Sequence, residues 1–237
     1  MNYSVLGRDG PPGRPNRCHD TARPAVAPYL LALLFCFTVA ASAEPPLTNR
    51  IGMVMIRVPA GFWAGQHEVT QAEYEKVMGT NPSKFRGARL PVQNVNWNDA
   101  MEFCRKLTEL ERPAGRVYRL PTEKEWEQLV ADATLDDAVT GRFDKDGKGL
   151  GPAEVGSRKP NQLGLYDIRG NMWEWCLNDY MANSQWKVLR GGAWSVSDHD
   201  NLAIGTRLNV EPYVGYEFYG FRCVLVPETP TSETTGR

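Results

Sequence analysis

Two carboxylates bracket a tight turn in the sequence and form the first candidate site for chemistry. Asp167 and Glu174 lie seven positions apart, and the backbone carbonyls of Gly170 and Met172 could fill further positions around a hard cation. The spacing predicts a calcium site, and the alternative is that both carboxylates only cap and pair within the turn. The run 144–149, Asp-Lys-Asp-Gly-Lys-Gly, also looks like a calcium loop, but it lacks the later glutamate of an EF-hand and is more typical of a solvated turn.

Three cysteines follow the N-terminal leader described below: Cys104, Cys176 and Cys223. An oxidising compartment would allow two of them to pair and leave one single. A bond between Cys104, on a predicted helix, and Cys223, near the C-terminus, would close a long loop, and two buried free thiols are the alternative. Cys176 has no histidine nearby in the sequence, which favours a small core residue over a nucleophile.

Histidines and serines are too few or too close together for the common catalytic sites. Beyond the leader the chain has only His67 and His199, whereas a non-haem iron centre of the sulfur-oxidising type needs two or three imidazoles. Ser195 and Ser197 lie beside Asp198 and His199, but neighbours in one loop cannot all converge on one attacked atom. The sequence also contains no phosphate-binding glycine loop and no dinucleotide fingerprint.

The N-terminus resembles an export signal. The run 29–39 is mostly apolar, follows a stretch with several arginines, and ends in Ala41-Ser42-Ala43, which predicts cleavage after Ala43. Eleven apolar positions are fewer than the roughly 20 that a spanning helix needs, and a retained anchor is the alternative. We therefore expect a signal peptide at 1–43 and one domain at 44–237 with its core at about 51–227, in the periplasm or associated with the outer membrane. The formal charge of −1 provides no basic stripe for nucleic acid.

Local signals predict few helices and a fold rich in loops. The alternation over 51–59 is typical of a strand, and the run 96–107 places apolar residues at helical spacing on one face. Capping boxes at Thr70 and Thr122 predict two further helices, the first of which runs to Gly79. After Val130 no sustained helical period appears, and short extended runs are expected at 188–192 and 218–226.

The order of motifs resembles that of the formylglycine-generating enzyme (sulfatase-modifying factor) family across the whole expected domain. The shared segments, in chain order, are 53–61, 68–70, 91–97, 119–123, 164–167, 170–175, 190–192 and 220–222. The resemblance implies an α+β, variant C-type-lectin fold with little regular secondary structure. It also implies a structural disulfide at Cys104–Cys223 and a structural calcium at Asp167, Gly170, Met172 and Glu174.

The chain departs from this family where the catalytic residues of competent members lie. Those members carry two copper-binding cysteines between the Gly-Gly motif and the final Gly-Phe-Arg, but the run 193–207 has none here. Copper(I) prefers thiolates, so we expect neither copper nor formylglycine formation. Arg190, Trp194, Asn201 and Arg207 are predicted to line what remains of the groove. The link between Gly61 and Glu68 is also shorter than the hairpin of typical members.

Exported members without the cysteine pair include periplasmic regulators of type VI secretion, and the chain resembles these most. The implied role is a non-catalytic binding protein that promotes activation of a membrane Ser/Thr kinase through its periplasmic domain, with outer-membrane lipoproteins as further partners. The aromatics Tyr213, Tyr216, Phe218 and Tyr219 could form the binding surface or belong to the core. The alternative is a periplasmic tailoring enzyme that resembles the siderophore-maturation member of the family.

Overall fold

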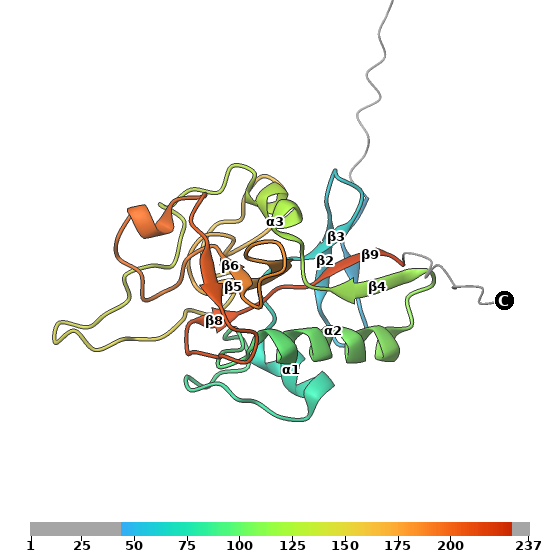
Figure 1. Cartoon of the computed structure of the whole chain (residues 1–237), viewed down its shortest axis with the longest axis horizontal. Helices are drawn as coiled ribbons and strands as arrows, with labels where there is room; N and C mark the ends of the chain where they lie inside the picture. The colour runs from blue at the N-terminus through green and yellow to red at the C-terminus, as the bar shows by residue number, and fades with distance from the viewer. Residues whose placement is uncertain (1–43, 229–237) are drawn as a thin grey trace, which may run out of the picture. The chain divides into compact units, whose positions relative to one another are not determined.

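The computed structural model describes residues 44–228, which form two β-sheets, three α-helices and long loops (Figure 1). The leader expected at 1–43 lies outside the described residues. Within the described part of the chain, no helix is both long enough and apolar enough to cross a bilayer. No helix or named strand occurs between Val130 and Trp173, so the prediction of an α+β fold rich in loops is confirmed.

Helices α1 and α3 begin where the capping boxes at Thr70 and Thr122 predict, and α2 begins directly after Asn96, the start of the predicted run. Helix α1 spans Gln71–Met78 and α3 spans Glu123–Val130, capped by Thr70 and Thr122. Helix α2, Trp97–Glu111, is capped by Asn96, whose side chain accepts from the Asp99 amide while Asp99 bonds back to the Asn96 amide. These reciprocal bonds satisfy amides that a helix leaves unpaired at its start.

The larger sheet joins the two ends of the domain. Its order is β1 (Leu47–Thr48), β2 (Val54–Arg57), β3 (Trp63–Gly65), β9 (Val224–Pro227) and β4 (Arg116–Arg119), and every pair is antiparallel. Strand β2 is shorter than the expected 51–59 because Gly52, at φ 93°, makes a turn just before it. Helix α2 packs beside edge strand β4, where the Thr108 hydroxyl accepts from the Tyr118 amide at 2.9 Å. The helix therefore covers an edge that could otherwise pair with another chain.

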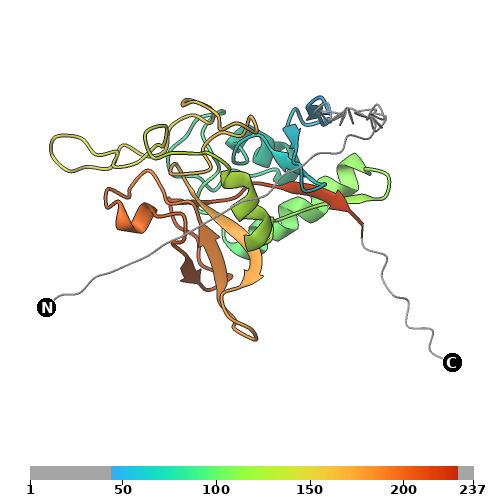
Figure 2. The same cartoon turned by 90° about the horizontal axis from the view of Figure 1, so that it is seen from above.

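The second sheet carries Glu174, Cys176, Arg190 and Tyr219 among the positions considered below. Its order is β7 (Leu208–Val210), β6 (Lys187–Arg190), β5 (Trp173–Asp179) and β8 (Tyr219–Gly220), with β8 parallel to β5. A short 3₁₀ helix, η1 (Asp200–Leu202), lies in the loop between β6 and β7. In the views of Figures 1 and 2 the loop around residues 141–151, yellow-green, projects away from both sheets.

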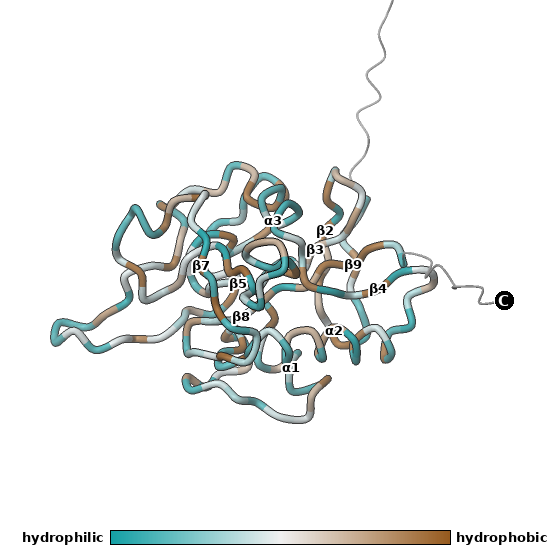
Figure 3. The backbone as a smooth tube through the Cα atoms, viewed as in Figure 1, coloured by the Kyte–Doolittle hydropathy of each residue, from teal (hydrophilic) through white to brown (hydrophobic). Residues whose placement is uncertain are grey.

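The apolar core lies between the sheets and helices. Hydrophobic residues concentrate along the central strands, whereas the outer loops are largely hydrophilic (Figure 3). The predicted face of α2 is buried, and so are Trp126 and Leu129 on α3. The Tyr74, Phe103 and Phe221 rings pack together with centroids 5.3–6.4 Å apart. Aromatic contacts of this kind join the helices to the C-terminal strands and hold the site residues in place.

Candidate functional site

A buried ion pair between Glu174 and Arg222 lies at the centre of the domain. Strand β5 positions Glu174, and Arg222 lies two residues before β9. Arg222 donates from Nε to both carboxylate oxygens at 3.0 Å and from Nη2 to Oε1 at 2.6 Å. The Trp126 indole donates to Oε2 of the same carboxylate at 2.9 Å. Both charged side chains are fully buried, so each depends on the other for compensation of its charge.

Two more carboxylates lie beside this pair. Asp167 accepts from the Gly156 amide at 2.7 Å through Oδ2, but its Oδ1 has no hydrogen-bond partner. Glu68 is 0 % exposed; no donor bonds to its carboxylate oxygens, but its carboxyl lies within hydrogen-bond reach of that of Asp167. Burial, followed by repulsion from Asp167 and Glu174, raises the pKa of Glu68 well above its ordinary value. Burial likewise raises the pKa of Asp167. We call Glu68, Asp167, Glu174 and Arg222 the buried acidic cluster.

The predicted calcium ligands are only partly available for a metal. Asp167 lies in the cluster with one oxygen that accepts no hydrogen bond from a donor, and Met172 is buried in the core. Both oxygens of Glu174 are engaged by Arg222 and Trp126, which corrects its expected role as a ligand. Glu68, which the sequence did not mark as a site residue, has the oxygens that Glu174 lacks. Carboxylate oxygens are the donors that calcium prefers, so the cluster fits a hard cation through Asp167 and Glu68.

The expected groove around Arg190 is closed by ion pairs. Arg190 is 2 % exposed and donates from Nη1 to Glu123 at 2.7 Å and from Nη2 to the Ile204 carbonyl at 2.8 Å. Arg207 donates to both oxygens of the same Glu123, and its guanidinium lies 4.5 Å from the Tyr180 ring centroid. Arg190 and Arg207 therefore lie close together, as expected for residues of one groove. Both bond to Glu123, so they link the β6–β7 region to α3 instead of facing a ligand.

Replacing Glu123 with alanine is expected to destabilise the protein by about 2 kcal/mol, the scale for losing charge-assisted bonds to a partly buried group. Arg190 would keep its bonds to Glu127 and Ile204, which limits the loss. Urea unfolding measures the difference, and Glu127→Ala is a suitable control because that side chain is about half exposed and makes only the 3.2 Å bond. An equal loss in the two variants would contradict the assigned role of Glu123.

Trp194 is also buried and does not line a groove. It is 2 % exposed, its ring centroid lies 5.5 Å from that of Phe85, and its indole donates to the Glu217 carbonyl. The projecting loop lies directly against it, since a Cβ on Gly149 would stand 2.8 Å from the Trp194 ring. Asn201 is exposed and bonds to Asp198. The prediction of a groove lined jointly by Arg190, Trp194, Asn201 and Arg207 is therefore wrong, because two of the four are core residues.

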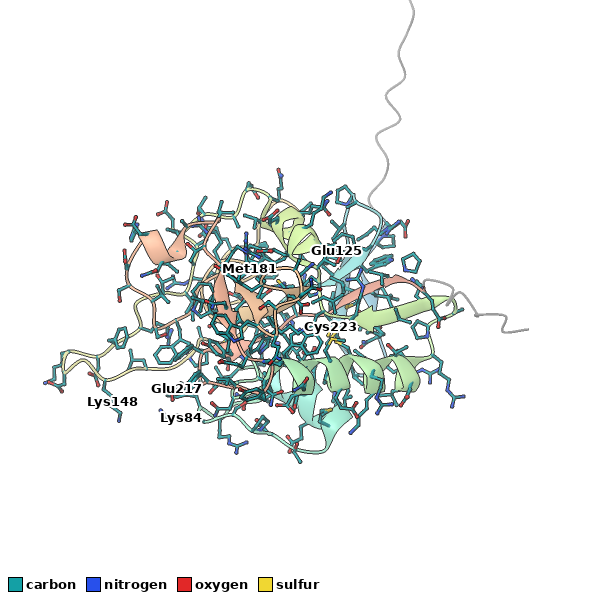
Figure 4. All side chains as sticks on the ribbon, in the orientation of Figure 1. Lys84, Glu125, Lys148, Met181, Glu217 and Cys223 are labelled. Atoms are coloured by element: carbon teal, nitrogen blue, oxygen red, sulfur yellow. The ribbon has the colours of Figure 1, made fainter. Side chains whose placement is uncertain are left out.

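The two cysteines of the expected disulfide lie side by side. The Cys104 and Cys223 sulfurs are 3.5 Å apart, between α2 and the larger sheet (Figure 4). Both are free thiols in the structure, so the bond itself stays a prediction. Burial raises the pKa of Cys223 well above its ordinary value. Cys176 is fully buried, as expected for a core residue.

The aromatic residues near the C-terminus divide between surface and core. Tyr213 and Tyr216 are 69 % and 52 % exposed, whereas Tyr219 is buried and Phe218 is half-buried. Tyr216 stacks on Phe218 with ring centroids 5.5 Å apart. Glu217 turns outward from this loop and pairs with Lys84, and Figure 4 shows the two side by side. Tyr213 and Tyr216 are thus exposed, and stacking on Phe218 holds Tyr216 in place; we call these two rings the exposed aromatic surface.

Residues 38–226 match the sulfatase-modifying factor enzyme 1-like domain. The chain belongs to this family. It is 31 % identical over 202 residues to the mouse protein named inactive C-alpha-formylglycine-generating enzyme 2, covering 74 % of this chain and 61 % of that protein. It is also 31 % identical over 158 residues to the serine/threonine-protein kinase pkn1 of Chlamydia pneumoniae, covering 57 % of this chain and 24 % of the kinase. The chain thus spans less than two thirds of either relative.

Solved structures agree on the fold of this family member. Treponema denticola variable protein 1 superposes with a TM-score of 0.63 at 26 % identity, over 77 % of this chain and 94 % of that chain. PvdO from Pseudomonas aeruginosa gives 0.64 at 18 % identity, over 79 % of this chain and the whole of that chain. The predicted family and fold class are confirmed.

Proposed function

We propose that this family member is a non-catalytic, exported binding protein that promotes activation of a membrane Ser/Thr kinase of type VI secretion by docking on its periplasmic domain. The observation that carries the proposal is the sequence of the run 193–207, which has no cysteine where competent relatives hold copper. The surrounding positions now serve packing, since Arg190 and Trp194 are buried. The similarity to the mouse protein that is named inactive also supports a non-catalytic role.

The link to a kinase is supported by the match to pkn1. That match covers only 24 % of the kinase, so a domain of this type occurs within a kinase chain. In this protein the domain would act from a separate chain, as the resemblance to the periplasmic regulators of type VI secretion implies. A regulator of this kind must bind one kinase state more tightly than the other, and a coupling of about 1–3 kcal/mol corresponds to a shift of roughly 5- to 150-fold.

The exposed aromatic surface is the docking face that we propose. Tyr213 and Tyr216 provide large, rigid contact area at low entropic cost, and Tyr216 is held by its stacking on Phe218. The Asn94 amide also donates to the Tyr216 carbonyl at 3.0 Å, which fixes the backbone of this loop. Aromatic residues of this kind often dominate the energy of protein interfaces.

The test begins with a pull-down. Residues 44–237 would be immobilised with calcium present and exposed to periplasmic extract, and we expect mass spectrometry to identify the outer segment of a membrane Ser/Thr kinase. Adding the protein to that kinase in proteoliposomes should then raise autophosphorylation about fivefold or more. Recovery of a small peptide-like molecule that the protein converts, with no kinase bound, would favour the tailoring-enzyme alternative.

Surface variants locate the docking face. The double change Tyr213→Ala and Tyr216→Ala should abolish most of the kinase activation without lowering the melting temperature. The matched control is Met181→Ala with Trp186→Ala, an exposed apolar pair on the loop between β5 and β6. Equal loss of activation in both double variants would contradict the assignment of the face.

A further inference from the structure

A cleft lies between helix α1 and the loops that pack against it. Its volume is about 420 Å³, within the range of roughly 300–1,000 Å³ that is typical of small-molecule sites. Its walls come from the stretch 51–54, from positions between 66 and 76, from residues 88–89, and from Gly156 and Tyr166. We call it the α1 cleft. Neither the run 193–207 nor the exposed aromatic surface contributes to its lining, so a ligand here would occupy a site of its own.

Two cations of the α1 cleft lack a close carboxylate partner. Lys76 donates to the Ile51 carbonyl at 2.7 Å and belongs to no ion pair within residues 44–228. Arg89 donates to the Val155 carbonyl at 3.1 Å. Its Nε lies 3.7 Å from Glu154, but the two side chains are 63 % and 65 % exposed, so solvent screens this pair. Both cations are therefore available to a ligand.

The charge of the lining favours an anion. Among the described residues that line the cleft, Glu73 carries the only carboxylate, and it is 7 % exposed. Its Oε2 accepts from the Thr70 amide and hydroxyl, both at 2.8 Å, in the capping box of α1. Lys76 and Arg89 are exposed, and their two positive charges outweigh this single acid. An arginine guanidinium also pairs with a carboxylate or phosphate group through two parallel hydrogen bonds.

His67 brings a hydrogen-bond acceptor to the same lining. Its Nδ1 lies 2.7 Å from the Glu68 carbonyl oxygen, and because a carbonyl only accepts, Nδ1 carries the proton. In the neutral ring Nε2 then has the lone pair and accepts from a donor. The apolar part of the lining comes from Ile51, Val54 and the partly buried Tyr166. A matching ligand therefore has a donor and an apolar body in addition to its negative charge.

We propose that the α1 cleft binds a small organic anion that has an apolar body and a hydrogen-bond donor, with its carboxylate or phosphate group held by Lys76 and Arg89. The donor bonds to Nε2 of His67, and the apolar body packs against Ile51, Val54 and Tyr166. The site is separate from the proposed docking face and does not rest on the kinase partner.

Histidine-ring NMR of the exported protein, residues 44–237, tests the site with a defined probe. N-acetylphenylalanine carries a carboxylate, an amide N–H and an apolar ring, and we expect a dissociation constant of about 1 mM or lower. Residues 44–237 contain only two histidines, so the probe should shift the ring signals of His67 and leave those of exposed His199 unchanged. The neutral amide of the same probe should bind about tenfold more weakly or worse, because the charge-assisted bonds are lost.

The phosphonate analogue of the same probe identifies the preferred anion. Tighter binding of the phosphonate assigns the natural ligand to the phosphate compounds, and tighter binding of the carboxylate assigns it to the carboxylic acids. Absence of a His67 shift with both probes at about 10 mM would overturn the proposal, since binding that weak has no specific basis. Equal affinity for N-acetylphenylalanine and its neutral amide would also overturn it.

Variants at exposed positions assign the binding to this cleft. Lys76→Gln and Arg89→Gln should each weaken binding of N-acetylphenylalanine about fivefold or more, without lowering the melting temperature. The matched control is Arg86→Gln, an exposed arginine of the same loop that does not line the cleft. Equal weakening in Arg86→Gln would indicate a general charge effect and contradict the proposal.

His67→Asn tests the acceptor. The asparagine amide can still donate to the Glu68 carbonyl, but no group replaces Nε2. Calorimetry should therefore show weaker binding of N-acetylphenylalanine by a protein that melts at the wild-type temperature. Unchanged affinity in His67→Asn would contradict the role of His67 as the acceptor for the ligand.

Discussion

Replacing Glu174 with alanine is expected to lower the free energy of unfolding by about 3–5 kcal/mol, since the buried Arg222 guanidinium loses its hydrogen-bonded counterion and keeps only the unbonded carboxylates of Glu68 and Asp167 nearby. Arg222 would keep only the bonds to the Gly65 and Tyr166 carbonyls, each at 2.9 Å. The Trp126 indole would lose its acceptor as well. A loss of this size is a large part of the stability of a single domain, so the variant should unfold at much lower urea concentration than the wild type.

The matched control is an ion pair on the surface. Arg105 pairs with Glu102 on the exposed face of α2, and Glu102→Ala should cost far less than Glu174→Ala, because solvent screens this surface pair. The double variant Glu174→Ala with Arg222→Met should recover part of the loss, because the unpaired charge is then removed. If Glu174→Ala cost no more than Glu102→Ala, the central role of the buried ion pair would be disproved.

Local signals in the sequence are sufficient to predict where the helices lie. A capping box is complete within four residues, so Thr70, Asn96 and Thr122 can be recognised without knowledge of the fold. The buried face of α2 follows from its spacing for the same reason. The fold class came from the order of motifs along the chain, which is also visible in the sequence.

The contacts that define the site are not local, and the sequence could not supply them. Glu174 meets Arg222 across 48 residues and Arg190 meets Glu123 across 67. Spacing along the chain does not indicate which arginine neutralises which acid. The expected groove failed for this reason, since Arg190 and Arg207 were assigned to a ligand without knowledge of Glu123. Glu68 was missed because its signal, a glutamate just before a buried helix start, resembles an ordinary surface residue.

The positions around the run 193–207 have a structural role in this protein. Arg190 fastens β6 to α3, Trp194 packs beneath the projecting loop, and Arg222 neutralises Glu174. Tight packing of this kind favours a rigid scaffold, and a rigid scaffold suits an exposed binding surface because little order must be gained on association. The structural role of these residues is therefore consistent with a binding protein that no longer needs an open active site.

Oxidation of Cys104 and Cys223 is expected to stabilise the protein by about 4–5 kcal/mol in the chain-entropy model, less any strain in the bond. The two residues are 119 positions apart, and a disulfide between them would restrict the unfolded chain over about half of its length. The sulfurs are already 3.5 Å apart, so only a small movement is required to form the bond. Urea unfolding with and without reductant measures the difference, and thiol counting before unfolding shows which state was compared.

Variants at each cysteine assign the effect to this pair. Cys223→Ala should remove the difference between reduced and oxidised protein, whereas Cys176→Ala should retain it, because Cys176 is buried elsewhere in the core. The oxidised wild type should titrate as a single thiol after unfolding, as expected for a protein with three cysteines in the domain. Three reactive thiols in protein purified without reductant would contradict the bond, and they would leave the hydrophobic core and the buried ion pair as the main sources of stability.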